Sequence, residues 1–197
     1  EEHSDSCAET AELVQFQIDQ VNRLTALVRT LLEMSNLQSV SRSDEIELAP
    51  LVDEILTDLT TLAEQKNITL HQNCEDVHMI GSDTLIYRLL FNLVENAIKY
   101  NRPDGSVQVC ITQEPEKLLI LVSDTGRGIP EEYQQSIFQP FFRVDKSRSR
   151  EYGGVGLGLS LVWEIANLHG GSVWVEKSSE KGTTIAVDLP TQQSTQP

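Results

Sequence analysis

Four polar side chains recur at helical spacing in the segment NLVENAIKY. Asn92, Glu95, Asn96 and Lys99 are three or four residues apart, so on a helix they would share one face. An asparagine amide oxygen can complete the shell of a magnesium ion that phosphates already hold, and a lysine can neutralise a phosphate oxygen. A solvated helix face with a Glu95–Lys99 ion pair would show the same spacing, so this motif alone leaves both interpretations open.

A second motif, DTGRGIP, directly follows an apolar run that is typical of a strand. Asp124 would stand at the end of that strand, ahead of glycines that let the backbone approach a ligand closely. A carboxylate in that position suits the amino edge of a nucleobase. A glycine turn capped by the Asp124 side chain explains the same residues equally well.

A glycine-rich run, GGVGLGL at residues 153–159, comes immediately before a predicted helix. Glycines that open a helix leave backbone N–H groups unpaired, and the helix dipole favours an anion there. The dipole contributes only about 0.3–1 kcal/mol, too little to hold a triphosphate alone. The run lacks the lysine of a Walker loop and does not follow a strand, as a dinucleotide-binding fingerprint would.

A short cationic stretch separates these two glycine motifs. Arg143, Lys146, Arg148 and Arg150 fall within eight positions of a chain that has only 15 basic residues. Such a segment could fold over a phosphate chain as a lid. For any single arginine of the stretch, a solvated loop is the simpler interpretation.

Composition and charge argue against several classes of function. The 197 residues include 30 acidic and 15 basic side chains, which gives a net charge of −15. Because nucleic acids and anionic membranes would repel such a chain, we expect neither as a partner. The 3 cysteines form no CxxC pair and the 4 histidines show no metal-ligand spacing. No apolar run is long enough for a membrane span, and we expect a cytoplasmic chain.

Hydrophobic periodicity predicts a long helix, a linker and then alternating strands and helices. Residues 11–37 contain no Gly or Pro and carry apolar residues at heptad-like spacing. This helix should therefore pack against another helix, either upstream in a longer parent chain or in a second copy; packing against the rest of this domain is the alternative. A polar linker follows at 39–44. Beyond it the expected strands are 45–48, 68–72, 77–80, 107–112, 118–123, 172–176 and 183–189, and the expected helices are 51–65, 83–100, a short one after Pro130, and 157–169.

These elements predict an α+β fold, a two-layer α/β sandwich with a mixed sheet and helices on one face. The strands at 107–112 and 118–123 should form one hairpin, and those at 172–176 and 183–189 another. Two hairpins do not fit a doubly wound parallel sheet. Ser82 or Asp83 should cap the helix over 83–100, and His169 should end the helix over 157–169.

In this order and at these separations, the motifs together resemble the catalytic ATP-binding domain of bacterial sensor histidine kinases. That family belongs to the superfamily of gyrase, heat-shock chaperone and mismatch-repair ATPases. NLVENAIKY resembles the asparagine box, and DTGRGIP and GGVGLGL resemble the two glycine boxes. FQPFFRVD (138–145) resembles the phenylalanine box, and KGTT (181–184) the final glycine-threonine element.

The resemblance covers about residues 45–189 and implies the domain organisation. The leading helix is similar to the second helix of the family's dimerisation hairpin and ends in LLEMSNL, like the frequent LLxxSxL pattern. We therefore expect a partial dimerisation helix at 1–40, a catalytic ATP-binding domain at 45–190 and a polar tail at 191–197.

The resemblance also implies a role for each matching residue. Asn96 would coordinate Mg²⁺, and Asp124 would accept the adenine amino group. Arg143 would reach the γ-phosphate, and Glu95 matches the carboxylate with which ATP-hydrolysing relatives activate water. The catalytic candidates are Glu95, Lys99 and Arg143. The remaining ATP-binding candidates are Asn92, Lys99, Tyr100, Gly126, Gly128, Ile129, Arg148, Gly154, Val155, Gly156, Leu157, Gly158, Leu159 and Thr183.

One departure from the family concerns the phospho-accepting histidine. In the family it sits on the first dimerisation helix, in a motif like H-[ED]-x-x-x-P, and this chain has no such motif. We therefore expect the first helix, the sensor region and any membrane anchor to be absent from this chain; a natural variant without the acceptor is the alternative. By itself the chain should not autophosphorylate.

The resemblance implies a protein-histidine kinase that uses ATP and Mg²⁺. It would pass the γ-phosphoryl group to a histidine of a homodimeric parent kinase and then to an aspartate of a response-regulator receiver domain. Two alternatives stay open: a gyrase-type ATPase and a regulatory module that binds nucleotide without transferring phosphate.

Overall fold

The computed structural model describes residues 14–18, 20–21, 24–25, 28, 32, 37–144 and 156–191. Before Leu37 the described residues are helical, in agreement with the predicted long helix. Their large apolar side chains are exposed: Val14, Phe16, Ile18, Val21, Leu24, Val28 and Leu32. The dimerisation role of this helix and the domain limits derived from it stay predictions.

Strands and helices alternate in the rest of the described chain. The strands are β1 (Asp44–Glu47), β2 (Thr69–Cys74), β3 (His78–Gly81), β4 (Ser106–Gln113), β5 (Lys117–Asp124), β6 (Ser172–Ser179) and β7 (Gly182–Pro190). The α-helices are α2 (Leu48–Asp58), α3 (Thr60–Glu64), α4 (Asp83–Lys99) and α6 (Gly158–Leu168). Short 3₁₀ turns are η1 (Leu37–Ser39), η2 (Glu131–Tyr133) and η3 (Ser136–Phe138).

The main sheet has the strand order β2-β4-β5-β7-β6. β2 runs parallel to β4, and the remaining neighbours are antiparallel, so the sheet is mixed as predicted. β4–β5 and β6–β7 are the two predicted hairpins. β1 and β3 form a separate antiparallel pair at one end of the molecule.

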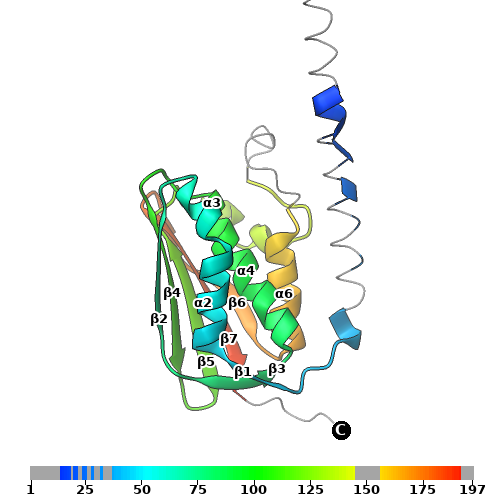
Figure 1. Cartoon of the computed structure of the whole chain (residues 1–197), viewed down its shortest axis with the longest axis vertical. Helices are drawn as coiled ribbons and strands as arrows, with labels where there is room; N and C mark the ends of the chain where they lie inside the picture. Colours follow the sequence, from blue (N-terminus) through cyan, green and yellow to red (C-terminus); the bar gives the residue numbers. More distant parts are fainter. Residues whose placement is uncertain are drawn as a thin grey trace, which may run out of the picture.

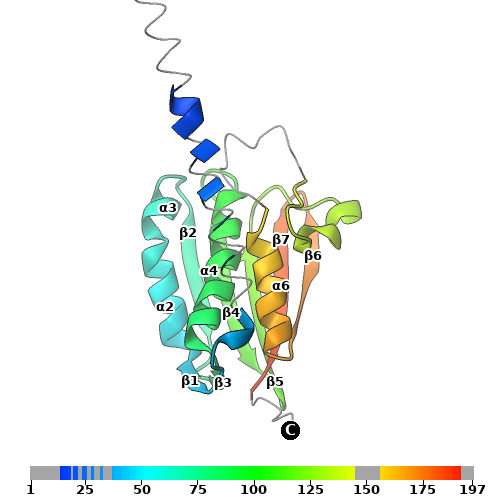
Figure 2. The same cartoon turned by 90° about the vertical axis from the view of Figure 1, so that its right-hand side faces the viewer.

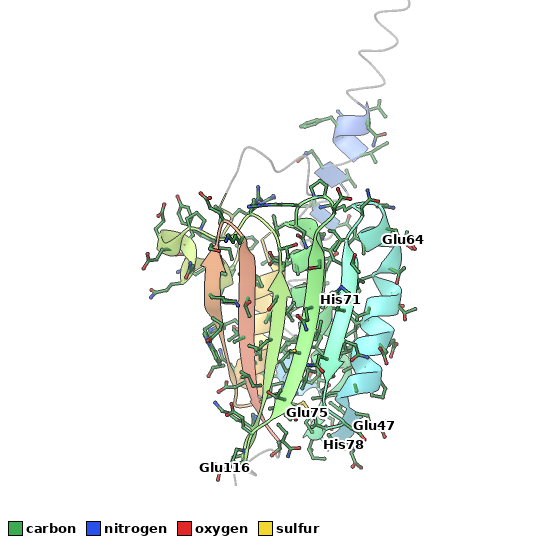
Figure 3. All side chains as sticks on the ribbon, turned by 90° about the vertical axis from the view of Figure 1, so that its left-hand side faces the viewer. Glu47, Glu64, His71, Glu75, His78 and Glu116 are labelled. Atoms are coloured by element: carbon green, nitrogen blue, oxygen red, sulfur yellow. The ribbon has the colours of Figure 1, made fainter. Side chains whose placement is uncertain are left out.

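Two layers make up the body of the protein, which confirms the predicted α/β sandwich. α2, α4 and α6 lie side by side on one face of the sheet (Figures 1 and 2). On β4, Val107, Val109 and Ile111 alternate towards these helices and are completely buried. No described helix covers the other face of the sheet, which Figure 3 views directly.

The helix predicted at 51–65 is instead two helices that meet at Leu59. Two threonine hydroxyls beside the break donate to backbone carbonyls one turn earlier: Thr57 to Asp53 at 2.8 Å and Thr60 to Leu56 at 2.9 Å. Such bonds compete with the backbone ladder and bend helices. The apolar stripe continues across the break because Leu59 remains buried.

The predicted side-chain cap of α4 is wrong. Ser82 is the N-cap residue, but its hydroxyl makes no capping bond. Its backbone N–H donates to Nε2 of His169, 3.1 Å away at the end of α6. The predicted helix end at His169 is confirmed.

The C-terminal end of α4 is held by a lysine from the loop after α3. Nζ of Lys66 donates to the carbonyl oxygens of Lys99 at 2.6 Å and Ile98 at 3.5 Å. A cation at this end interacts favourably with the helix dipole. The Ile98 carbonyl also accepts from the Asn101 backbone N–H at 3.3 Å. Lys66 thereby fixes the helix end that carries the asparagine motif.

We expect Lys66→Met to lower the free energy of unfolding by about 1 kcal/mol, because two carbonyls of α4 lose a charged donor. Lys117→Met is the matched control, since Lys117 pairs only with partly exposed carboxylates and should contribute less than about 0.5 kcal/mol. Urea unfolding followed by circular dichroism measures both. Equal losses in the two variants would contradict the capping role.

Candidate functional site

The asparagine motif occupies the half-buried face of α4, opposite its core face. Asn92, Glu95, Asn96 and Lys99 are all intermediate in exposure, whereas the core face of α4 is buried: Leu85, Leu89, Leu90, Leu93 and Ala97. Lys99 Nζ lies 2.8 Å from Glu95 Oε1, so the ion pair considered above is present. The Asn92 amide group donates to the Arg88 carbonyl at 2.8 Å, which leaves its Oδ1 directed away from that bond.

The N-terminus of α6 meets this polar face of α4. A Cβ at Gly158 would lie 2.8 Å from Asn92 Oδ1 and 3.4 Å from Asn96 Nδ2, so a side chain there would have to displace the Asn92 amide. The N-cap residue Leu157 has no polar side chain to satisfy the first N–H groups. The positive end of the helix dipole therefore lies beside two amide side chains, an arrangement suited to an anion.

Asp124 ends β5 and is partly buried. Its Oδ1 accepts hydrogen bonds from the backbone N–H of Gly126 at 2.7 Å and of Thr183 at 3.2 Å. Among the described residues none donates to Oδ2. Burial raises the pKa of Asp124, and the two backbone hydrogen bonds oppose that shift. The carboxylate therefore caps a glycine turn and also offers a free acceptor oxygen.

Close backbone contacts join the ends of α4 and β5. A Cβ at Gly126 would lie 2.6 Å from the Tyr100 carbonyl oxygen and 3.2 Å from the Asn101 Cα. Gly128 has a φ of +75°, and a Cβ there would collide with the Ser179 carbonyl. Glycine is required at both positions, as the motif predicts, because a side chain would push these segments apart.

A serine that the sequence reasoning missed organises the wall beside Asp124. Ser178 Oγ accepts from the Ile129 backbone N–H at 2.7 Å and lies 3.0 Å from Thr183 Oγ1. Ser178 and Thr183 are direct partners in the β6–β7 register. The only available signal was that hairpin pairing, since the strand was predicted to end at 176.

Arg127 is the second residue that was missed. Its guanidinium carbon lies 5.3 Å from the centre of the Tyr100 ring, within the range of a cation–π contact. It belongs to the DTGRGIP motif, in which the aspartate, the glycines and the isoleucine were predicted to contact the ligand. It places a positive charge near the C-terminal end of α4 in an acidic chain.

The stretch between the glycine motifs is described as far as Val144, and the chain is described again from Gly156. The Phe141 backbone N–H donates to the Gly156 carbonyl at 2.9 Å, which brings the ends together, and Gly156 has a φ of +81°. Arg143 is half-buried beside this junction. Five predicted residues, Lys146, Arg148, Arg150, Gly154 and Val155, lie outside the described residues, and their roles stay predictions.

Comparison with known proteins agrees with this geometry. Residues 81–193 match the family described as histidine kinase-, DNA gyrase B- and HSP90-like ATPase, and this match includes Asn92, Asn96, Asp124 and Gly158. The chain belongs to this ATPase family. The predicted resemblance to a histidine-kinase ATP-binding domain is thereby confirmed.

Relatives of this family member include named sensor kinases. The chain is 34% identical over 177 residues to the sensor histidine kinase RppB of Synechocystis sp. (strain ATCC 27184 / PCC 6803 / Kazusa), covering 87% of this chain and 39% of that protein. It is 32% identical to the sensor histidine kinase WalK of Bacillus subtilis (strain 168), covering 87% of this chain and 29% of WalK. The chain thus spans less than half the length of these curated relatives.

Solved structures of the family have the same fold. The catalytic domain of the histidine kinase ThkA is 29% identical, with a TM-score of 0.69, and the match covers 78% of this chain and 98% of that domain. ThkA in complex with the response regulator protein TrrA matches with a TM-score of 0.72 and 27% identity, over 90% of this chain and 50% of ThkA. Among the described residues no helix is long and apolar enough to cross a membrane.

We expect the partly buried Asp124 carboxylate to destabilise the fold at high pH, where it is ionised. Because its folded-state pKa is raised, its stabilising contribution is present below the ordinary Asp pKa and is lost as the pH rises through the folded-state pKa. Asp124→Asn should therefore raise the unfolding temperature of the nucleotide-free chain at about pH 8, and the difference should shrink towards about pH 4. Thermal unfolding at both pH values tests this; a variant less stable than the parent at pH 8 would contradict it.

Proposed function

We propose that this chain binds Mg²⁺-ATP and donates its γ-phosphoryl group as the catalytic domain of a two-component sensor histidine kinase. The observation that carries the proposal is that α4 meets both features, the Asp124 turn at Tyr100 and the α6 N-terminus at Asn92. Asp124 offers a free carboxylate oxygen at one end, and Gly158 brings an uncapped helix terminus against two asparagines at the other. Similarity to named sensor histidine kinases supports it.

Adenine recognition would rest on Asp124. Its Oδ2 would accept the exocyclic amino group, while the bonds from Gly126 and Thr183 hold the carboxylate in place. The Thr183 hydroxyl, which is hydrogen-bonded to Ser178 Oγ, would reach the base through a water. Such a charge-assisted bond discriminates against a base that lacks the amino donor.

Phosphate binding would rest on the meeting of α4 and α6. The free N–H groups at the start of α6 would donate to phosphate oxygens, and Asn92 and Lys99 would contact them from α4. Asn96 would ligate Mg²⁺ through its amide oxygen. No group of three or more His, Cys, Asp or Glu that could hold a metal occurs among the described residues, so phosphate oxygens would have to supply much of the coordination.

In the transfer step, an imidazole nitrogen of an acceptor histidine would attack the γ-phosphorus in line with the leaving oxygen. The P–N bond forms, the bond to the β–γ bridging oxygen breaks, and ADP leaves. Arg143 and Lys99 would neutralise the charge that develops on the transferred group. The phosphoryl group would then pass to an aspartate of a response regulator, a partnership consistent with the ThkA–TrrA complex.

The leading helix would supply the dimer contact to the parent kinase. Its exposed apolar residues would pack on the corresponding helices of a homodimer, whose first helix carries the acceptor histidine. In this proposal the chain is the cytoplasmic part of a membrane-anchored sensor.

Mg²⁺-ATP should bind the intact chain, and Asp124→Ala should weaken binding tenfold or more, because the amino group loses a charged acceptor worth about 1.5–3 kcal/mol. Asp76→Asn is the control, since Asp76 is exposed and lies outside the motifs. Isothermal titration calorimetry measures both affinities. An unchanged affinity in Asp124→Ala would remove the basis of the proposal.

Phosphoryl transfer distinguishes the kinase from the other members of the superfamily. When labelled ATP and a separate chain carrying an acceptor helix are added, we expect label on that helix and none on the chain alone. Steady ATP hydrolysis that Glu95→Gln abolishes would favour a gyrase-type ATPase instead. The Glu95–Lys99 ion pair argues against that outcome, because it engages the carboxylate that would have to activate water.

A further inference from the structure

His169 connects two helices at the end of the molecule opposite the candidate site. The side chain is buried, and its Nδ1 lies 2.8 Å from the Ile165 carbonyl oxygen. The backbone N–H of Ser82 donates to its Nε2 at 3.1 Å. A backbone N–H can only donate, so Nε2 must be the acceptor and the ring proton must reside on Nδ1, which donates to Ile165. Both bonds require the neutral ring.

The ring has little room to change its place. A Cβ at Gly81 would lie 3.1 Å from His169 Cδ2 and 3.2 Å from His169 Nε2, so the end of β3 approaches the imidazole as closely as its lack of a side chain allows. Gly81 directly precedes the N-cap of α4. The imidazole is therefore enclosed by the start of α4 on one side and by its own helix on the other.

The contact at His169 and the contact at Gly158 lie at opposite ends of one helix pair. α4 and α6 lie side by side, and the start of α4 meets the end of α6 (Figure 2). Asn92 is ten residues beyond Ser82, and His169 is eleven residues beyond Gly158. At about 1.5 Å per residue, both intervals are about 15 Å long. A shift of α6 along α4 at one end must therefore appear at the other.

We propose that His169 is a positioning residue for nucleotide binding, which holds α6 in register with α4 so that the α6 N-terminus faces Asn92 and Asn96. The inference rests on the proposed function, because it assigns a consequence for ATP affinity. The essential contact is the cross-helix bond from Ser82. The bond to Ile165 lies within α6 and serves to fix the tautomer.

The register contact depends on pH. Burial lowers the pKa of His169 below its ordinary value of 6.5, the positive charge of Arg42 lowers it further, and the bond to Ile165 opposes the shift. The stabilising contribution is therefore fully present above about 6.5 and is lost as the pH falls through the folded-state pKa. The other charged or titratable side chains on the elements that meet there are Asp44, Glu45 and Glu47 on β1, His78 on β3, Asp83 at the start of α4, Glu164 on α6 and Asp188 on β7.

Two substitutions separate the two bonds of the imidazole. In His169→Gln the amide oxygen reaches as far as Nε2 and can accept from Ser82 without titrating. In His169→Asn the amide nitrogen can replace Nδ1, but nothing reaches Ser82. His71→Gln is the control, because His71 is exposed on the uncovered face of the sheet, far from α6 (Figure 3).

Calorimetric titration with Mg²⁺-ATP at about pH 7.5 and about pH 5.5 tests the proposal on the whole chain. We expect His169→Asn to bind roughly fivefold or more weakly than the parent at the higher pH, and His169→Gln to stay within about twofold. At the lower pH the parent should lose more affinity than His169→Gln, while His71→Gln should follow the parent. Because protonation of ATP affects all four proteins alike, only the differences between them count. Equal affinities for the parent and His169→Asn would overturn the proposal, whatever their stabilities.

A readout without nucleotide keeps this inference separate from the proposed function. In ¹⁵N NMR spectra of the free chain, the Gly158 amide and the Asn92 side-chain amide should shift in His169→Asn and stay in place in His169→Gln. If they shift while no protein binds ATP, the proposed function fails and the register contact stands. If ATP binds and these signals do not move, the register contact fails and the proposed function stands.

Discussion

The approach of α6 to the polar face of α4 is the constraint on which the rest of the site depends. α4 is two-sided: one face carries leucines that are completely buried against the sheet and α2, and the other carries asparagines. Gly158 lets a second helix begin directly on that polar face, closer than a side chain would allow without displacing the Asn92 amide. Since the core fixes α4, and α6 packs on α4 along its whole length, the site geometry follows from hydrophobic packing below it.

The same arrangement is how an acidic chain would present the proposed anion site. A net charge of −15 produces a repulsive field at long range, but salt screens it beyond about 8–10 Å. Near the site the local groups are the α6 N-terminus and Arg127, while Lys99 and Glu95 neutralise each other in their ion pair. Local dipoles and cations therefore dominate over the average charge.

At Asp124, the cost of burying a carboxylate is set against its use in binding a ligand. A carboxylate at the end of a buried strand loses hydration, and two backbone N–H groups restore only part of it. A residue that costs stability at a place where it exposes one free acceptor oxygen is typical of a site kept for a ligand.

Sequence patterns determined the elements whose signal is local. The 3.6-residue period of α4, the two hairpins, the mixed sheet with one covered face and the order of the motifs could all be predicted, because each is written in spacing between neighbours. The single helix predicted over 51–65 was wrong at Leu59, because threonine hydroxyls beside it donate to backbone carbonyls and bend the helix. Only the tertiary structure decided that Ser82 is satisfied by His169, that Ser178 supports Ile129, and that Gly158 meets Asn92. These contacts join residues 49 to 87 positions apart in the sequence, and no local periodicity records such distant pairs.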